Sequence, residues 1–127
     1  MRGNFILAAL LASAVSALDE PRAVLARFLA SVDHREILAR VLRNLRGIFV
    51  EQGREDRALN AAHKICLLLP DHAEEIRTRG YLYTKLDCFA QAVDDYSRYL
   101  QLAPDAADTD TIRGLVTELA GKVGRLN

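Results

Sequence analysis

Two cysteines and three histidines are the side chains in this sequence that are best suited to nucleophilic catalysis or metal binding. They are Cys66, Cys88, His34, His63 and His72. A thiol nucleophile needs a histidine that activates it and an acid behind that histidine, and neither cysteine stands in such a run at helical spacing. No two histidines are four residues apart and no CxxC occurs, so the common metal-binding spacings are absent too. The sequence predicts no catalytic residue, no metal site and no cofactor.

The charged residues do not point to nucleic acid. Lys plus Arg and Asp plus Glu number 17 each, which gives a formal net charge of zero. Arginines are frequent between residues 35 and 57, but acidic residues interleave with them and no aromatic stacking platform accompanies them. A protein or peptide partner is therefore the better hypothesis.

The first seventeen residues, 1–17, allow two interpretations. Arg2 precedes an apolar run, and Val15-Ser16-Ala17 offers small residues where a signal peptidase cuts, which is the layout of a secretory signal. The same run is also a good helix former and could be an apolar helix of the domain. It is too short to span a bilayer. Both interpretations stay open, and with them the choice between a cytoplasmic and an exported, periplasmic protein.

The elements that would position any functional residue repeat with a period of 34. Such a period is typical of stacked helix pairs. Four pairs of similar residues carry it: Leu42 and Ile76, Phe49 and Tyr83, Ala58 and Ala92, Pro70 and Pro104.

Apolar residues at helical spacing predict five main helices within one domain, residues 18–127. Capping boxes at Asp33–Glu36 and Asp71–Glu74 are expected to begin the first and third helices. Gly53, Pro70 and Pro104 are expected to end helices. The repeats cover about 39–72 and 73–106, a capping helix covers about 108–125, and the segment 21–30 is a candidate amino-terminal cap.

This helix order also predicts the state of the cysteines. Cys66 and Cys88 fall at opposite ends of adjacent antiparallel helices, separated by roughly 20 Å. A disulfide needs Cα atoms within about 7 Å, so two free thiols are expected.

Residues 73–106 resemble a tetratricopeptide repeat, with Gly80, Tyr83, Ala92, Tyr96 and Pro104 at signature positions. Residues 39–72 resemble a weaker copy. The resemblance implies an all-α fold, a right-handed superhelix of antiparallel helix pairs with a C-terminal capping helix. Arg79 departs from the pattern because it stands where an apolar residue is usual, and it is expected to reach a carboxylate.

The stretches 35–49 and 77–83 also resemble the C-terminal half of the bacterial SirB family. That family joins a transglutaminase-like domain to a helical repeat tail. The resemblance implies that this chain covers the tail, from about residue 25 onward, without the front domain. One functional hypothesis is then a regulatory or truncated remnant that supports an enzyme domain encoded elsewhere.

The other hypothesis is a non-enzymatic scaffold that binds a protein or peptide in the concave groove of the repeats. In such repeats the first helix of each pair lines the groove, and Arg43 and Arg77 occupy equivalent positions one repeat period apart. Two arginines placed in this way favour carboxylates, which predicts an acidic ligand. The alternative is that both arginines are solvated or pair with nearby glutamates. The predicted groove residues are Arg40, Arg43, Arg77, Tyr81, Thr84 and Lys85.

Overall fold

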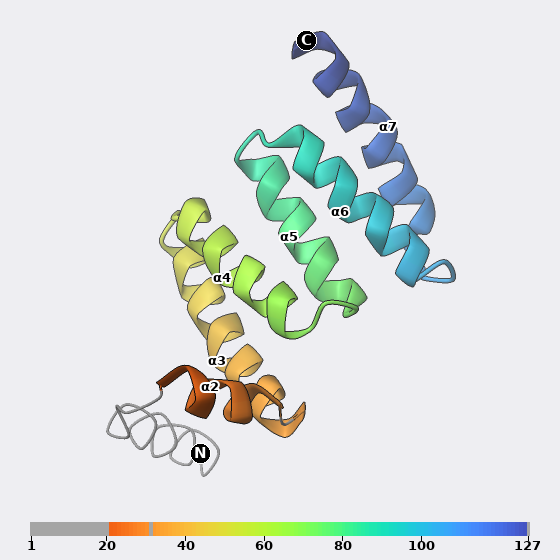
Figure 1. The fold of residues 1–127 in the computed structure, drawn as a ribbon. Helices are drawn as coiled ribbons and strands as arrows, with labels where there is room; N and C mark the ends of the chain where they lie inside the picture. Colours follow the sequence, from red (N-terminus) through yellow and green to blue (C-terminus); the bar gives the residue numbers. More distant parts are fainter. Residues whose placement is uncertain (1–20, 31, 127) are drawn as a thin grey trace.

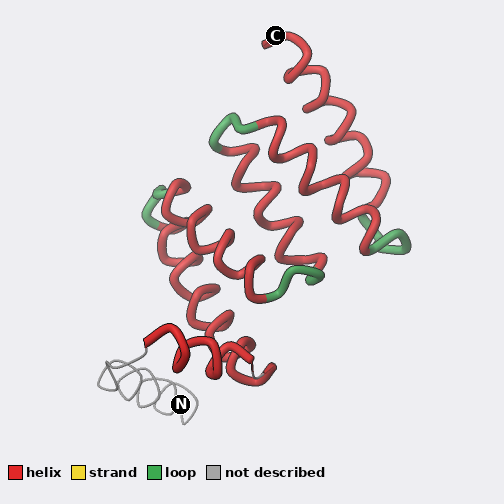
Figure 2. The backbone as a smooth tube through the Cα atoms, viewed as in Figure 1, coloured by secondary structure: helices red, strands yellow, loops and turns green. Residues whose placement is uncertain are grey.

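A computed structural model describes residues 21–30 and 32–126, and this part of the chain is helical with short connections (Figure 2). The interpretations of residues 1–17 fall outside the described residues. The helices are α2 (Pro21–Ala30), α3 (Val32–Glu51), α4 (Glu55–Leu68), α5 (Ala73–Lys85), α6 (Phe89–Leu102) and α7 (Thr109–Leu126). The described residues contain no strand, which confirms the all-α prediction.

The helices stack in chain order (Figure 1). α3 pairs with α4 and α5 pairs with α6, while α4 packs on α5 and joins the two pairs. α7 packs on α6 at the far end, as the predicted capping helix should. α2 contacts α3 and crosses it near the beginning of that helix. The two helix pairs thus form one continuous stack.

The turns inside the two pairs are built alike. Gly53 and Asp87 hold equivalent places in the two repeats, and both have a left-handed backbone, with φ of 69° and 58°. The amide after each one donates to a carbonyl five residues back, Arg54 to Phe49 at 2.8 Å and Cys88 to Tyr83 at 2.9 Å. This bond satisfies a carbonyl that the end of the helix would otherwise leave without a partner. The repeat period therefore extends to the backbone.

The predicted capping boxes are wrong. α3 begins at Val32, so Asp33 lies inside its first turn and does not precede it. α5 begins after His72, and no side-chain bond caps it. The Asp71 carboxylate instead accepts a hydrogen bond from Arg98 of α6 at 3.1 Å. Asp71 therefore forms an ion pair with the second helix pair and does not cap α5.

Small residues lie where the helices cross. Ala58 and Ala92 are completely buried. A Cβ added at Gly80 would lie 3.1 Å from the ring of Tyr96 and 3.3 Å from the Cβ of Asp95, so glycine lets α5 and α6 approach this closely without displacing either side chain. The sequence-based assignment of these three positions to helix crossings is confirmed.

Enlarging one of these residues tests the packing. We expect Ala92→Leu to lower the free energy of unfolding by about 1–3 kcal/mol, because the extra carbons have no space. Ala120→Leu on α7 is the matched control, since Ala120 is exposed. Urea denaturation followed by circular dichroism measures both variants. Equal stability of the two would show that α6 does not cross its neighbours at Ala92.

Both cysteines are free, as predicted. Cys66 is buried in α4, and Cys88 precedes α6 in the turn. Burial raises the pKa of the Cys66 thiol, which is the opposite of what a thiolate nucleophile requires. Cys66 therefore acts as a small core residue.

Candidate partner-binding face

Arg43 is tied to a buried carboxylate of the next repeat. Its Nε donates to Oε1 of Glu75 at 2.5 Å, and Nη1 of Arg46 donates to the other oxygen, Oε2, at 2.6 Å. The Glu75 side chain is only 7% exposed. Burial alone would raise the pKa of Glu75, but the hydrogen bonds from Arg46 and Arg43 outweigh it and hold that pKa below its usual value. The cluster joins α3 to the first turn of α5.

Arg77 makes the equivalent connection one unit later. Its Nε donates to Oδ2 of Asp108 at 2.7 Å, just before α7 begins. The Tyr99 hydroxyl donates to the other oxygen of Asp108 at 2.6 Å, and this bond raises the pKa of Tyr99 to about 12. The hydrogen bond from Tyr99 and, to a smaller extent, the one from Arg77 hold the pKa of Asp108 below its usual value. Each repeat thus places an arginine on an acid of the unit that follows.

Of the two alternatives for Arg43 and Arg77, pairing with internal carboxylates is what the structure shows. Their side chains nevertheless remain 30% and 41% exposed. The bond to Asp108 uses the Nε of Arg77, and the guanidinium carbon lies 6.0 Å from the centre of the Tyr99 ring. The terminal nitrogens of this partly exposed side chain remain as donors for a second carboxylate. Arg43 is more confined, because its Nη1 also lies 3.8 Å from Glu36.

The other predicted groove residues differ in their availability. Arg40 is exposed on α3. Tyr81 is 52% exposed, and the Nζ of Lys85 lies 5.8 Å from the centre of its ring. The Thr84 hydroxyl donates to the carbonyl of Gly80 at 2.9 Å, so it is already engaged with its own helix. The structure brings Tyr81 and Lys85 together and leaves Thr84 a minor member.

Arg77, Tyr81 and Lys85 follow one another at intervals of four residues along α5. Residues at this spacing share one side of a helix. They form a stripe of two cations with an exposed aromatic ring between them. We call the surface made by Arg40, Arg43, Arg77, Tyr81, Thr84 and Lys85 the α3–α5 face.

Arg79 reaches a carboxylate, as the sequence predicted. Its Nε and Nη2 donate to the two oxygens of Asp95, both at 2.7 Å, and Asp95 is 5% exposed. The hydrogen bonds to Asp95 raise the pKa of Arg79. Nη1 of Arg79 also lies 3.3 Å from Nδ1 of His63 on α4. The contacts of Arg79 thus connect α4, α5 and α6. They explain why an arginine stands at position 79, where an apolar residue is usual.

The Glu75 cluster should make stability depend on pH. Because the native pKa lies below the usual value of 4.5, the unfolded chain takes up the proton first as pH falls. The stabilisation is therefore complete above the unfolded pKa and is lost as pH falls through the native pKa. We expect Glu75→Gln to remove this part of the pH dependence, measured by urea denaturation between about pH 3 and pH 7. Glu74→Gln, on the exposed neighbour, should keep it; equal curves for the two variants would contradict the assignment.

Two further observations bear on the function class. The described residues hold no group of three or more histidine, cysteine or acidic side chains placed to bind a metal ion. Among the described helices, none is both long and apolar enough to cross a membrane.

Known proteins are similar to this chain in sequence. The family model described as tetratricopeptide repeat matches residues 45–117. A UPF0162 protein of Xylella fastidiosa is 39% identical over 98 residues, which are 77% of this chain and 35% of the relative. The UPF0162 protein YchA of Escherichia coli is 28% identical and protein SirB1 of Salmonella typhimurium 27% identical, each over 94 residues, 74% of this chain and 35% of the relative. The chain thus spans about a third of the length of these curated relatives.

The family model covers the end of α3, all of α4, α5 and α6, and the first half of α7. The similarity to SirB1 agrees with the resemblance found in the sequence, and the fold is of a kind that mediates contacts between proteins. With the family model matching more than half of its length, the chain belongs to the tetratricopeptide repeat family and is a SirB-like member of it.

Proposed function

We propose that the chain is a non-enzymatic scaffold and that its α3–α5 face binds an acidic segment of a partner protein. The observation that carries this proposal is the stripe on α5, where the exposed ring of Tyr81 lies between Arg77 and Lys85. Tyrosine and arginine are enriched among the residues that dominate binding energy at protein interfaces. A half-exposed tyrosine beside two cations favours a peptide with both apolar and acidic side chains.

The residues of this face have different roles in the proposal. Tyr81 supplies apolar contact area, and Lys85 and Arg40 supply charges. Arg77 offers its terminal nitrogens while Asp108 fixes its orientation. An arginine that is already ordered loses less side-chain entropy when a ligand arrives. Arg43 is mainly structural, so its replacement would disturb Glu75 as well as binding.

A defined probe tests the face. We expect a fluorescent peptide with alternating acidic and aromatic residues to bind the full chain more tightly than the same peptide with glutamines in place of its acids. Replacing both Tyr81 with Ala and Lys85 with Gln should weaken binding about tenfold or more, which is about 1.4 kcal/mol. Fluorescence anisotropy measures the affinity, and added salt should weaken it.

The matched control replaces Gln91 and Gln101 of α6 with Ala, since both are exposed and lie outside the face. This variant should bind like the parent. Equal affinities for the two peptides, or equal binding by the Tyr81/Lys85 variant and the parent, would contradict the proposal.

A second candidate function rests on the length of the relatives. Because the chain spans 35% of them, a helical region of this kind could support or regulate a transglutaminase-like enzyme domain encoded elsewhere. Stable co-purification of this chain with such a domain, without any acidic peptide, would favour the second candidate over the first.

A further inference from the structure

Equivalent faces of the two repeats differ in what covers them. Leu82 of α5 is 2% exposed because Ala58 and Ala62 of the preceding helix, α4, pack on it. Ile48 holds the equivalent position on α3, one repeat period earlier, and is 47% exposed. α2 crosses only the beginning of α3 (Figure 1). Among the described residues, therefore, no helix covers the first repeat as α4 covers the second.

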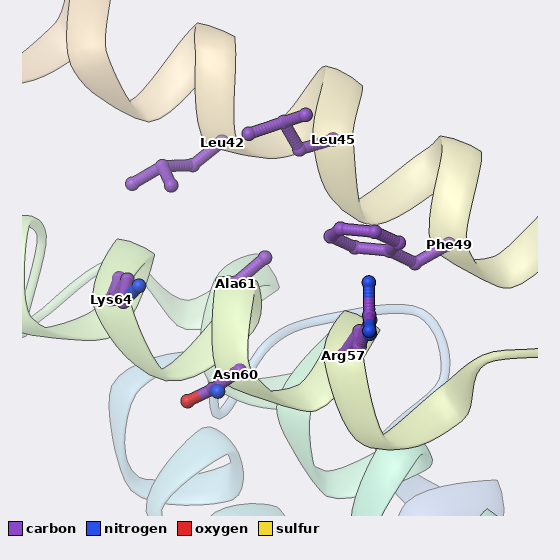
Figure 3. Close-up of a pocket in the computed structure, with 7 residues that line it drawn as sticks. All are labelled: Leu42, Leu45, Phe49, Arg57, Asn60, Ala61 and Lys64. Atoms are coloured by element: carbon purple, nitrogen blue, oxygen red, sulfur yellow. The ribbon is translucent and has the colours of Figure 1, made fainter.

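An apolar groove of about 310 Å³ continues this exposed surface between α3 and α4. In Figure 3 the side chains of Leu42 and Phe49 lie on the side of α3 that faces α4, and the Arg57 side chain rises from α4 toward the Phe49 ring. Leu45 is 40% exposed. We call this groove the end face, defined by Leu42, Leu45, Phe49, Arg57, Ala61 and Lys64.

The second repeat shows which residues of a covering helix pack against such a face. There the covering helix α4 presents Ala58, Leu59 and Ala62, a small–large–x–x–small pattern, to the Leu82 cluster. A carboxylate just beyond the end of α4, that of Asp71, reaches Arg98 of α6 at 3.1 Å. Lys64 stands one repeat period before Arg98 and is exposed on α4. By this equivalence, Lys64 is placed to receive a carboxylate that follows a docked helix.

We propose that the end face and Ile48 dock one amphipathic helix of a partner protein. That helix carries a small–large–x–x–small pattern on its apolar side and an acidic residue just beyond its C-terminal end, opposite Lys64. A second acidic residue meets Arg57. The end face is separate from the α3–α5 face, so this inference goes beyond the proposed function and does not depend on it.

Charge distinguishes this occupant from two others. A second copy of the chain, docked by the same face, would bring two sets of Arg57 and Lys64 together, and like charges in an interface oppose association. The apolar segment 5–15 contains no Asp or Glu, and the acids near it, Asp19 and Glu20, both follow its C-terminal end. Docked as a helix, this segment could therefore bring an acid to Lys64 but none to Arg57. A helix of another protein with acidic residues at these two places fits both the apolar groove and its charged rim.

The test uses the full chain and two synthetic helical peptides. Both carry the Ala-Leu-x-x-Ala pattern; one has Glu at the two flanking places and the other has Lys there. We expect the Glu peptide to bind at least about tenfold more tightly, measured by fluorescence anisotropy. Replacing Arg57 and Lys64 together with Glu should reverse this preference, and Ile48→Glu should abolish binding of both peptides. Gln91→Glu, at the position of α6 equivalent to Arg57, should change nothing.

Circular dichroism melts should show that these variants remain folded, because all four replaced side chains are exposed. Equal binding of the two peptides, or a preference that survives the double charge reversal, would overturn the proposal. It would also be overturned if the full chain bound neither peptide, since the face would then be closed by its own amino terminus or by a second copy.

Discussion

Replacing Arg79 with leucine is expected to lower the free energy of unfolding by about 3 kcal/mol. The loss has an electrostatic cause: Asp95 is 5% exposed, and Arg79 donates to both of its oxygens. Removing one partner of a buried ion pair leaves an uncompensated charge, which costs about 3–5 kcal/mol. The lower end applies here because the Arg79 side chain is 20% exposed. Urea denaturation at neutral pH measures the loss.

The first repeat suggests how this loss can be reversed. It carries Leu45 and Ala61 at the positions equivalent to Arg79 and Asp95. The double variant Arg79→Leu/Asp95→Ala should therefore regain most of the stability that Arg79→Leu loses. Arg98→Ala, which breaks an exposed pair, should cost no more than about 1 kcal/mol. If Arg79→Leu were no more harmful than Arg98→Ala, Asp95 would not depend on Arg79.

Replacing Leu82 with alanine is expected to lower the free energy of unfolding by about 2–5 kcal/mol. Leu82 is 2% exposed and packs with Ala58, Ala62 and Phe49, so it joins the first helix pair to the second. Truncation removes buried carbons and leaves a cavity that the small alanines around it cannot fill. Because neighbouring repeats stabilise each other through their interface, the loss should affect the whole stack.

The adjacent residue provides the control. Tyr81 is 52% exposed on the same helix, so Tyr81→Ala should change stability by only about 0.5 kcal/mol while it weakens binding at the α3–α5 face. The two variants should therefore separate folding from binding. If Leu82→Ala melted like Tyr81→Ala, the two helix pairs would not be joined through Leu82.

The repeat period was sufficient to predict the helix pairs and crossings that depend on residues recurring in both repeats, such as Ala58 and Ala92. That Arg79 reaches a carboxylate was predicted from its departure from the repeat pattern, without the identity of that carboxylate. The turn at Asp87 could have been found in the same way, because it lies one repeat period after Gly53. Aspartate, however, is less common than glycine with a left-handed backbone.

The ion pairs between repeats could not be assigned from local sequence. Glu75 lies far along the chain from both Arg43 and Arg46, and only the stacking of α5 on the first pair brings them together. A signal was present in the recurrence of an acid one unit after each arginine, Glu75 after Arg43 and Asp108 after Arg77. For Asp71 the local sequence was misleading. Its position suggested that it caps α5, but its carboxylate pairs with Arg98 of the second helix pair.

Binding of a partner protein at the α3–α5 face is the central claim, and site-specific photocrosslinking in the cell that makes this protein tests it most directly. A photoreactive phenylalanine analogue would replace Tyr81 in one variant and the exposed Gln101 of α6 in another. We expect position 81 to form a covalent adduct that mass spectrometry maps to an acidic segment of another protein, and position 101 to form none. Adducts from position 101 but not from position 81 would contradict the claim.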